Sequence, residues 1–187
     1  MGLNNTNSTT CLCNSCTTWL PLSILLCNLC QSVDISPYIK DALVDSAIAL
    51  LIVEGATRPN AMTVSFFSEV AHHPTALWVS IDRASFTYSL LAKTDRFTLA
   101  VLNQTQKQLA LECGTSSGRD KDKSASLKTY KSPGGFLFLQ GALASTGCNV
   151  RERIDLEEHT IFIADILESQ LDSRSAHLRQ LLLSDLN

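Results

Sequence analysis

Two short runs of alternating side chains, joined by a proline-containing turn, limit what the middle of the chain can fold into. Met62, Val64 and Phe66 share one face of the first run. The second run, 77–82, places Leu, Val and Ile on one face and Trp, Ser and Asp on the other. A period of two residues is typical of β-strands, and Pro74 between the runs predicts a turn. The pattern therefore predicts two strands that are connected through a His-His-Pro turn.

Hydroxyl side chains lie on the face of each predicted strand that is opposite its aliphatic row. Thr63 and Ser65 belong to the first run and Ser80 to the second, and a cation with two further hydroxyls follows where the second strand ends. Short hydroxyl donors beside a fixed cation suit a phosphate or the polar edge of a heterocycle. The same spacing also agrees with the plain solvent-facing side of an antiparallel pair, so the residues alone leave both interpretations open. The residues that follow the strand are Arg83, Ser85 and Thr87.

Ser85 is a good N-cap residue for a helix that we predict to run to about Lys93. The free backbone N–H groups at the start of such a helix would face Arg83 and Thr87, which predicts an anion pocket. Most other periodic runs indicate strands, so we expect an antiparallel β-barrel with short helical attachments. The expected strands are 46–53, 97–102, 136–153 and 160–166, and the expected helices are 38–43 and 105–113, with Cys113 and Cys148 as buried apolar residues.

Composition and charge exclude several classes of function. The chain has 187 residues, of which 45% are hydrophobic, and its net charge is −3. These values are typical of one ordinary globular domain. A weakly negative protein does not suit a polyanion, so we expect no nucleic-acid partner. No apolar run approaches the roughly 18 residues that a membrane span needs, so we expect no membrane partner.

Residues 1–33 differ from the rest of the chain because they contain no charged side chain, the first being Asp34. We therefore expect two parts, a flexible extension at 1–33 and a folded domain at 34–187. Two Cys-x2-Cys pairs in the extension have the spacing of a zinc or iron site, which is the alternative. The segment between the pairs lacks Gly and is rich in Leu and Ile, which favours the extension. The five cysteines of this part are Cys11, Cys13, Cys16, Cys27 and Cys30.

Five segments, in order along the chain, resemble motifs of the flavin reductase-like, FMN-binding split-barrel family. The resemblance covers about residues 40–180 and is far more specific than any single motif. Three departures are Ala61 in place of the usual Gly, Ser124 in place of an aromatic residue, and a His-His-Pro turn in place of Asp-Pro. The matching segments are 60–65 (N-A-M-T-V-S), 80–87 (S-I-D-R-A-S-F-T), 117–123 (S-G-R-D-K-D-K), 141–144 with Cys148, and 158–162 (E-H-T-I-F).

The resemblance implies a mainly β fold with short helices, an FMN-binding split β-barrel that forms a homodimer with the flavin near the subunit interface. It implies a closing strand at 177–181 and an NAD(P)H-dependent flavin reductase that transfers hydride to FMN, with FAD as a possible flavin. His159 is then the catalytic residue near the reactive face of the flavin. The implied cofactor-binding residues are Asn60, Met62, Thr63, Val64, Ser65, Ser80, Asp82, Arg83, Ser85, Thr87, Gly118, Arg119 and Lys123.

Two other functions remain open on the sequence. The chain is alternatively an FMN-binding electron carrier without a nicotinamide site, or a redox module in which the N-terminal cysteines hold a metal beside the flavin. For the reductase we expect a flavin-accepting oxygenase or another electron acceptor as partner. A cytoplasmic location is expected with either flavin function.

Overall fold

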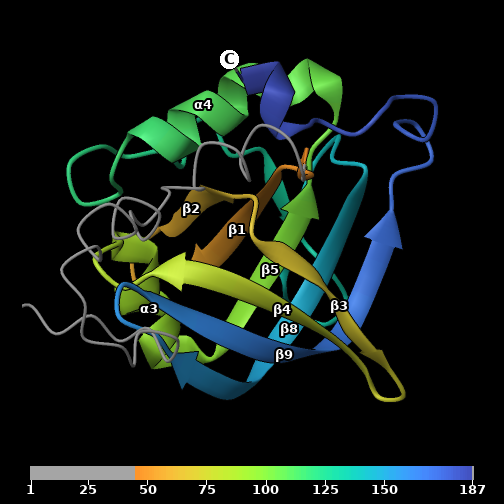
Figure 1. Cartoon of the computed structure of the whole chain (residues 1–187). Helices are drawn as coiled ribbons and strands as arrows, with labels where there is room; N and C mark the ends of the chain where they lie inside the picture. Colours follow the sequence, from red (N-terminus) through yellow and green to blue (C-terminus); the bar gives the residue numbers. More distant parts are fainter. Residues whose placement is uncertain (1–44, 187) are drawn as a thin grey trace, which may run out of the picture.

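The computed structural model describes residues 45–186. A seven-stranded antiparallel sheet in the order β2-β1-β5-β8-β9-β4-β3 dominates this part of the chain, and its strands curl into a barrel-like wall in Figure 1. The strands are β1 (Ala49–Glu54), β2 (Pro59–Val64), β3 (Phe67–His72), β4 (Thr75–Asp82), β5 (Arg96–Val101), β6 (Thr129–Lys131), β7 (Leu137–Leu139), β8 (Ala144–Asp155) and β9 (His159–Leu171). The helices are α3 (Phe86–Thr94) and α4 (Lys107–Thr115), with the short 3-10 helices η2 (Gln104–Gln106) and η3 (Leu183–Leu186). The predicted fold class, mainly β with short helices, is confirmed.

Strand β1 is buried on both faces because the sheet separates two hydrophobic cores. Leu51 belongs to the first core, which lies inside the curved sheet, and Leu50 to the second. The second core is completed by Ala110 and Cys113 of α4, which packs against β1 and β2. Burial raises the pKa of the Cys113 thiol to about 11, so this cysteine is a small apolar filler, as predicted. The buried strand predicted at 46–53 is confirmed.

The second predicted strand and the turn before it are confirmed, but the first predicted strand is wrong in extent and in partner. Strand β2 ends at Val64 and pairs with β1 rather than with β4. The side chain of Phe66, expected on the buried face, is 57% exposed. The chain leaves one sheet edge here and begins β3 at the other edge, where the Phe66 carbonyl accepts the N–H of Ser80 at 2.9 Å. The His73–Pro74 turn joins β3 to β4.

Two further predictions of strands need correction. The strand expected at 136–153 is divided into β7 and β8, because Gly141 takes a φ of +77°, a left-handed conformation that breaks an extended run. The closing strand expected at 177–181 is absent from the described residues, where Gln180 makes only an isolated bridge to Asn103. The helix predicted at 38–43 and the cysteine-rich extension 1–33 lie outside the described residues.

Candidate functional site

The first turn of α3 presents backbone N–H donors at the N-terminus of the helix. Ser85 is its N-cap with extended backbone angles, and its Oγ accepts the N–H of Tyr88 at 3.1 Å. The N–H groups of the first helical residues, Phe86 and Thr87, have no acceptor within a helix. These N–H groups and the helix dipole attract negative charge. The sequence therefore placed this N-terminus correctly, and its local geometry suits a phosphate.

A buried hydrogen bond connects the start of β2 to this turn. The Asn60 Nδ2 donates to the Thr87 Oγ1 at 2.8 Å, and both residues are almost fully buried. Because the Thr87 oxygen accepts this bond, its own hydroxyl proton is available to a ligand. Ala61 lies next to Asn60 in extended strand, and its φ is not positive, so the loss of Gly there causes no backbone strain.

The loop after α4 completes this corner of the molecule. A Cβ added to Gly118 would lie 2.0 Å from the Asn60 Oδ1, so the backbone at this point tolerates only glycine without movement. Arg119 follows with an exposed guanidinium whose central carbon is 5.8 Å from the centre of the Phe86 ring. We call the group Asn60, Ser85, Thr87, Gly118 and Arg119 the anion corner. It combines hydroxyls, helix N–H groups and one cation.

A second group of predicted residues surrounds an open hollow at the ends of β4 and β9. The antiparallel register pairs Asp82 with His159, and Ser80 lies two residues before Asp82 on the same strand. The hollow has a volume of about 880 Å³. The ring of His159 packs against Phe66 at a centroid distance of 6.5 Å, and among the described residues neither of its ring nitrogens is hydrogen-bonded. The lining consists of Phe66, Ser80, Arg83, Asp155, Leu156, Glu157, Glu158 and His159.

The connection 82–85 belongs to both groups. Asp82 ends β4 beside His159, and its backbone carbonyl accepts the N–H of Ser85 at 3.1 Å. Arg83 turns back instead, donating from its guanidinium to the Leu156 carbonyl at 3.3 Å and from its N–H to the Glu158 carbonyl. Arg83 is therefore a residue of the hollow. The predicted convergence of Arg83 with Ser85 and Thr87 is not what the side-chain contacts show.

The side chains of β2 that follow Asn60 and Ala61 are used for packing rather than for a site. Met62 packs on the first core, Val64 is buried within it, and the Thr63 hydroxyl donates to the Ala110 carbonyl of α4 at 2.5 Å. Strand β2 is nevertheless an edge strand of the sheet, so backbone groups on its outer side are outside the described ladders. Ser65, half-buried, lies just after the strand end. Any ligand contact from 62–64 is therefore made by the main chain.

Lys123 lies apart from both groups. Its ammonium is buried, and it donates to the carbonyls of Ser116 at 2.9 Å and Cys113 at 3.3 Å, at the end of α4. Burial lowers its pKa below the ordinary value for lysine. The arrangement does not bring this cation to the anion corner.

Sequence reasoning missed three residues that border the two groups: Arg58, Phe66 and Phe86. Arg58 donates to the Gly118 carbonyl at 3.2 Å and pairs with Asp122 at 3.0 Å, so it ties the loop to the β1–β2 turn. The Arg119 guanidinium lies over the ring of Phe86. Two signals were present, because Arg58 closely precedes Asn60 and Phe86 lies between the two hydroxyl residues of the helix start.

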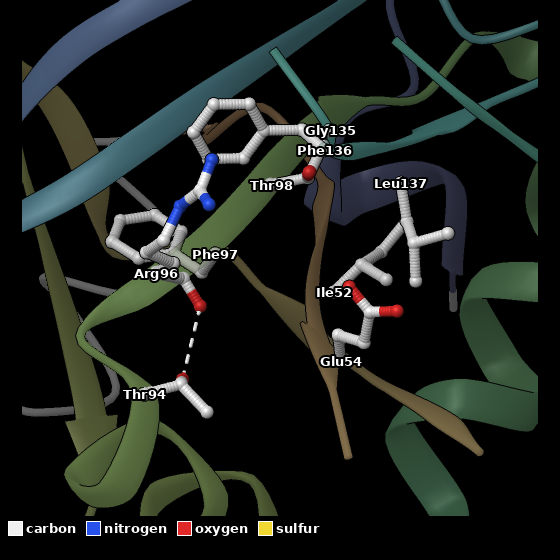
Figure 2. A pocket seen from close by; sticks show the side chains of 9 residues that line it. All are labelled: Ile52, Glu54, Thr94, Arg96, Phe97, Thr98, Gly135, Phe136 and Leu137. Atoms are coloured by element: carbon white, nitrogen blue, oxygen red, sulfur yellow. Dashed lines mark hydrogen bonds between the residues drawn. The ribbon is translucent and has the colours of Figure 1, made fainter. Parts of the chain in front are cut away.

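A separate pocket of about 300 Å³ contains none of the predicted residues. Figure 2 shows Arg96 and Glu54 on different sides of it, with Thr94 bonded to the Arg96 carbonyl. The Arg96 guanidinium lies 4.2 Å from the centre of the Phe136 ring and donates to a backbone carbonyl, and Glu54 pairs with Lys131. These groups already satisfy one another, so we do not assign the function to this pocket.

The described region contains neither a metal-binding cluster nor a membrane-spanning helix. Between residues 45 and 186, no three His, Cys, Asp or Glu side chains are grouped so that they could hold a metal ion. No helix in this part of the chain has the length and apolar character that crossing a membrane requires.

Comparisons with known proteins agree with the motifs. The family model described as "Flavin reductase like domain" matches residues 37–185. An uncharacterized protein of Archaeoglobus fulgidus is 28% identical over 124 residues, which are 63% of this chain and 68% of that protein. The NADH-dependent flavin reductase StyB of Pseudomonas fluorescens is 28% identical over 126 residues, which are 67% of this chain and 71% of that protein.

A solved structure extends the agreement to the fold. The FMN-binding protein of Thermus thermophilus with bound 1-cyclohex-2-enone superposes with a TM-score of 0.66 at 25% identity. The match covers 70% of this chain and 72% of that protein. The sheet described above is thus the split β-barrel of FMN-binding proteins. The chain belongs to the flavin reductase-like domain family.

Proposed function

We propose that this protein is an NAD(P)H-dependent flavin reductase that takes hydride from a reduced nicotinamide and uses FMN, with FAD as the alternative flavin. Family membership and the likeness to an NADH-dependent flavin reductase support the oxidoreductase class. The observation that carries the proposal is the arrangement around the 82–85 connection. It joins a corner with donors for a phosphate to an open hollow that contains an imidazole with no hydrogen-bond partner among residues 45–186.

The donors of the anion corner fit the phosphate of FMN. A phosphate monoester accepts several hydrogen bonds, and the corner offers the Ser85 and Thr87 hydroxyls, the first N–H groups of α3 and the Arg119 guanidinium. The outer main chain at the end of β2 and the adjoining Ser65 are the candidates for the polar edge of the ring. A bound flavin supplies the hydride acceptor, and the protein supplies binding and orientation.

The hollow provides what a nicotinamide requires. It is open to solvent, so a dinucleotide donor can enter and leave. Within it, the His159 imidazole and the Ser80 hydroxyl are polar groups that can hold a carboxamide, and Phe66 offers an apolar ring. Their task is to bring the donor carbon close to its acceptor, since orientation lowers the barrier without a covalent nucleophile.

A homodimer is the assembly that we propose. Leu77, Val79 and Ile81 point into the core, so Trp78 and Ser80 face outward on β4. On β9 the outward residues opposite them are Ile163 and Ile161. This outer apolar face borders the hollow, and a second copy of the chain would cover it. Sedimentation equilibrium at micromolar concentration should give twice the mass of one chain, and a monomer mass would contradict the proposal.

Replacing Ser85 by glycine tests whether the phosphate is bound at the anion corner. Glycine is nearly as good an N-cap as serine, so the helix is retained while the hydroxyl is lost. A hydrogen bond to a charged acceptor contributes about 1.5–3 kcal/mol, so FMN affinity should fall roughly tenfold or more. Riboflavin, which lacks the phosphate, should bind as it does to the wild type.

Flavin fluorescence titrations measure both affinities. Ser89→Ala is the matched control, because the Ser89 hydroxyl lies on the same helix but donates to the Phe86 carbonyl within that helix. Equal losses of FMN and riboflavin binding in Ser85→Gly would place the phosphate elsewhere.

A further inference from the structure

Lys123 differs from every other charged residue of the described chain in its burial. Its exposed fraction is 3%, and within residues 45–186 it is the only Lys, Arg, Asp or Glu that is buried. Its neighbour on the same loop, Lys121, has a half-exposed side chain that pairs with Glu112 at 2.8 Å. Burying an ammonium is unfavourable unless its protons are hydrogen-bonded. The cost of burying Lys123 must therefore be offset by hydrogen bonds that its ammonium makes.

The compensation comes from the end of α4. The last carbonyl groups of a helix receive no hydrogen bond from within the helix, and they form the negative end of the helix dipole. Helix α4 ends at Thr115, and the Lys123 ammonium donates to the carbonyls of Cys113 and Ser116 on either side of this end. The buried cation thus satisfies oxygens that would otherwise be unpaired.

The bond from Lys123 to Ser116 also closes the loop 116–123 at its two ends. Lys123 and Ser116 are the two ends of the segment 116–123, and the ammonium joins them. Within the loop, the Ser117 carbonyl accepts the N–H groups of Asp120 and Lys121 at 3.1 and 3.0 Å. The segment contains no helix or strand of its own, so these bonds, together with those of Arg58 to Gly118 and Asp122, define its shape. Its outer part carries the glycine and the arginine of the anion corner.

We propose that Lys123 is a positioning residue for phosphate recognition, which rests on the function proposed above. Its ammonium joins the ends of segment 116–123 and thereby holds Gly118 against Asn60 and presents Arg119 beside the start of α3. The cation does not touch the flavin. It acts through the shape of the loop, so its loss should affect the phosphate-bearing flavin selectively.

The test compares Lys123→Met with Lys121→Met in the full chain. Lys123→Met should raise the Kd and the KM for FMN at least about tenfold, because the loop is no longer closed. The Kd for riboflavin should change less than about threefold, and kcat at saturating FMN should stay within about a factor of two of the wild type. Lys121→Met should resemble the wild type in all three, since an ion pair at the surface contributes little and Lys121 is half-exposed.

A second readout needs no flavin. Trypsin cleavage after Arg119, followed by mass spectrometry, should be about tenfold faster in flavin-free Lys123→Met than in the wild type and Lys121→Met. Should Lys123→Met fail to fold, Lys123→Arg keeps the charge and Lys123→Gln keeps an N–H donor, and the better-folded of these takes its place. In the variant that is used, FMN affinity should still fall more than riboflavin affinity, and equal losses would overturn the proposal.

The outcomes separate the two proposals. Unchanged FMN affinity and unchanged cleavage would overturn the role of Lys123, as would equal losses for FMN and riboflavin, which indicate a general structural role. If the wild type itself binds FMN no better than riboflavin, the proposed phosphate site is wrong. The cleavage experiment then still decides whether Lys123 holds the loop.

Discussion

Gly118→Ala is expected to weaken FMN binding by about 5- to 150-fold while the protein remains folded. The added Cβ would lie 2.0 Å from the Asn60 Oδ1 and 2.9 Å from a ring carbon of Phe86. Asn60 cannot easily move away, because it is buried and bonded to Thr87. Overpacking of this kind costs about 1–3 kcal/mol, and moving the loop to relieve it withdraws Arg119 from the corner.

Titration of FMN into both proteins measures this effect, with circular dichroism to show that the fold persists. Gly114→Ala is the matched control, since Gly114 lies in the last turn of α4 and precedes the same loop. A Cβ there would lie 3.4 Å from the Thr63 Cβ, an ordinary contact, and alanine favours a helix. If Gly118→Ala and Gly114→Ala bind FMN equally well, the loop is not part of the flavin site.

His159→Ala is expected to slow hydride transfer from the nicotinamide up to about tenfold and to leave FMN affinity within about twofold. The imidazole lies in the hollow with both nitrogens unpaired among the described residues, so its hydrogen bond is available to the donor. A hydrogen bond of this kind contributes about 0.5–1.5 kcal/mol. Because the contact is made with the donor, the loss belongs to the reduction step.

Single-turnover reduction at saturating FMN measures this step. His72→Ala is the control, because His72 is an exposed histidine of β3 that pairs with Glu69 outside the hollow. A parallel fall in FMN affinity would contradict the assignment, since it would place His159 against the flavin rather than the nicotinamide.

Alternating side chains and N-cap residues predicted the strand and the helix that depend on neighbouring residues only. Strand β4 follows its alternation, and α3 begins directly after its N-cap Ser85, whose side chain bonds a backbone N–H three residues on. Strand β3 was missed because its residues are mostly exposed at a sheet edge, where no alternating apolar face is needed. The split between β7 and β8 depends on the left-handed backbone conformation of Gly141. The alternating pattern of the surrounding residues gives no sign of this conformation.

The residues of the candidate site could be predicted from the sequence, but the directions in which their side chains point could not. The family motifs named Asn60, Thr87 and Gly118, yet only the fold shows that these three meet in one buried cluster. A lysine that enters a protein interior has the same sequence surroundings as one in solvent. The side chain of Lys123 points inward because α4 ends where its carbonyl groups can accept the ammonium protons, and the motif alone does not predict this position.

The central claim is that the protein accepts hydride from a nicotinamide and is more than a flavin carrier. The most direct measurement is anaerobic stopped-flow absorbance at about 450 nm, with FMN-loaded protein mixed with NADH or with NADPH. The account predicts that at least one donor bleaches the flavin in a phase whose rate saturates with donor concentration. Flavin that stays oxidised with both donors, yet is readily reduced by dithionite, would contradict it and establish the electron carrier.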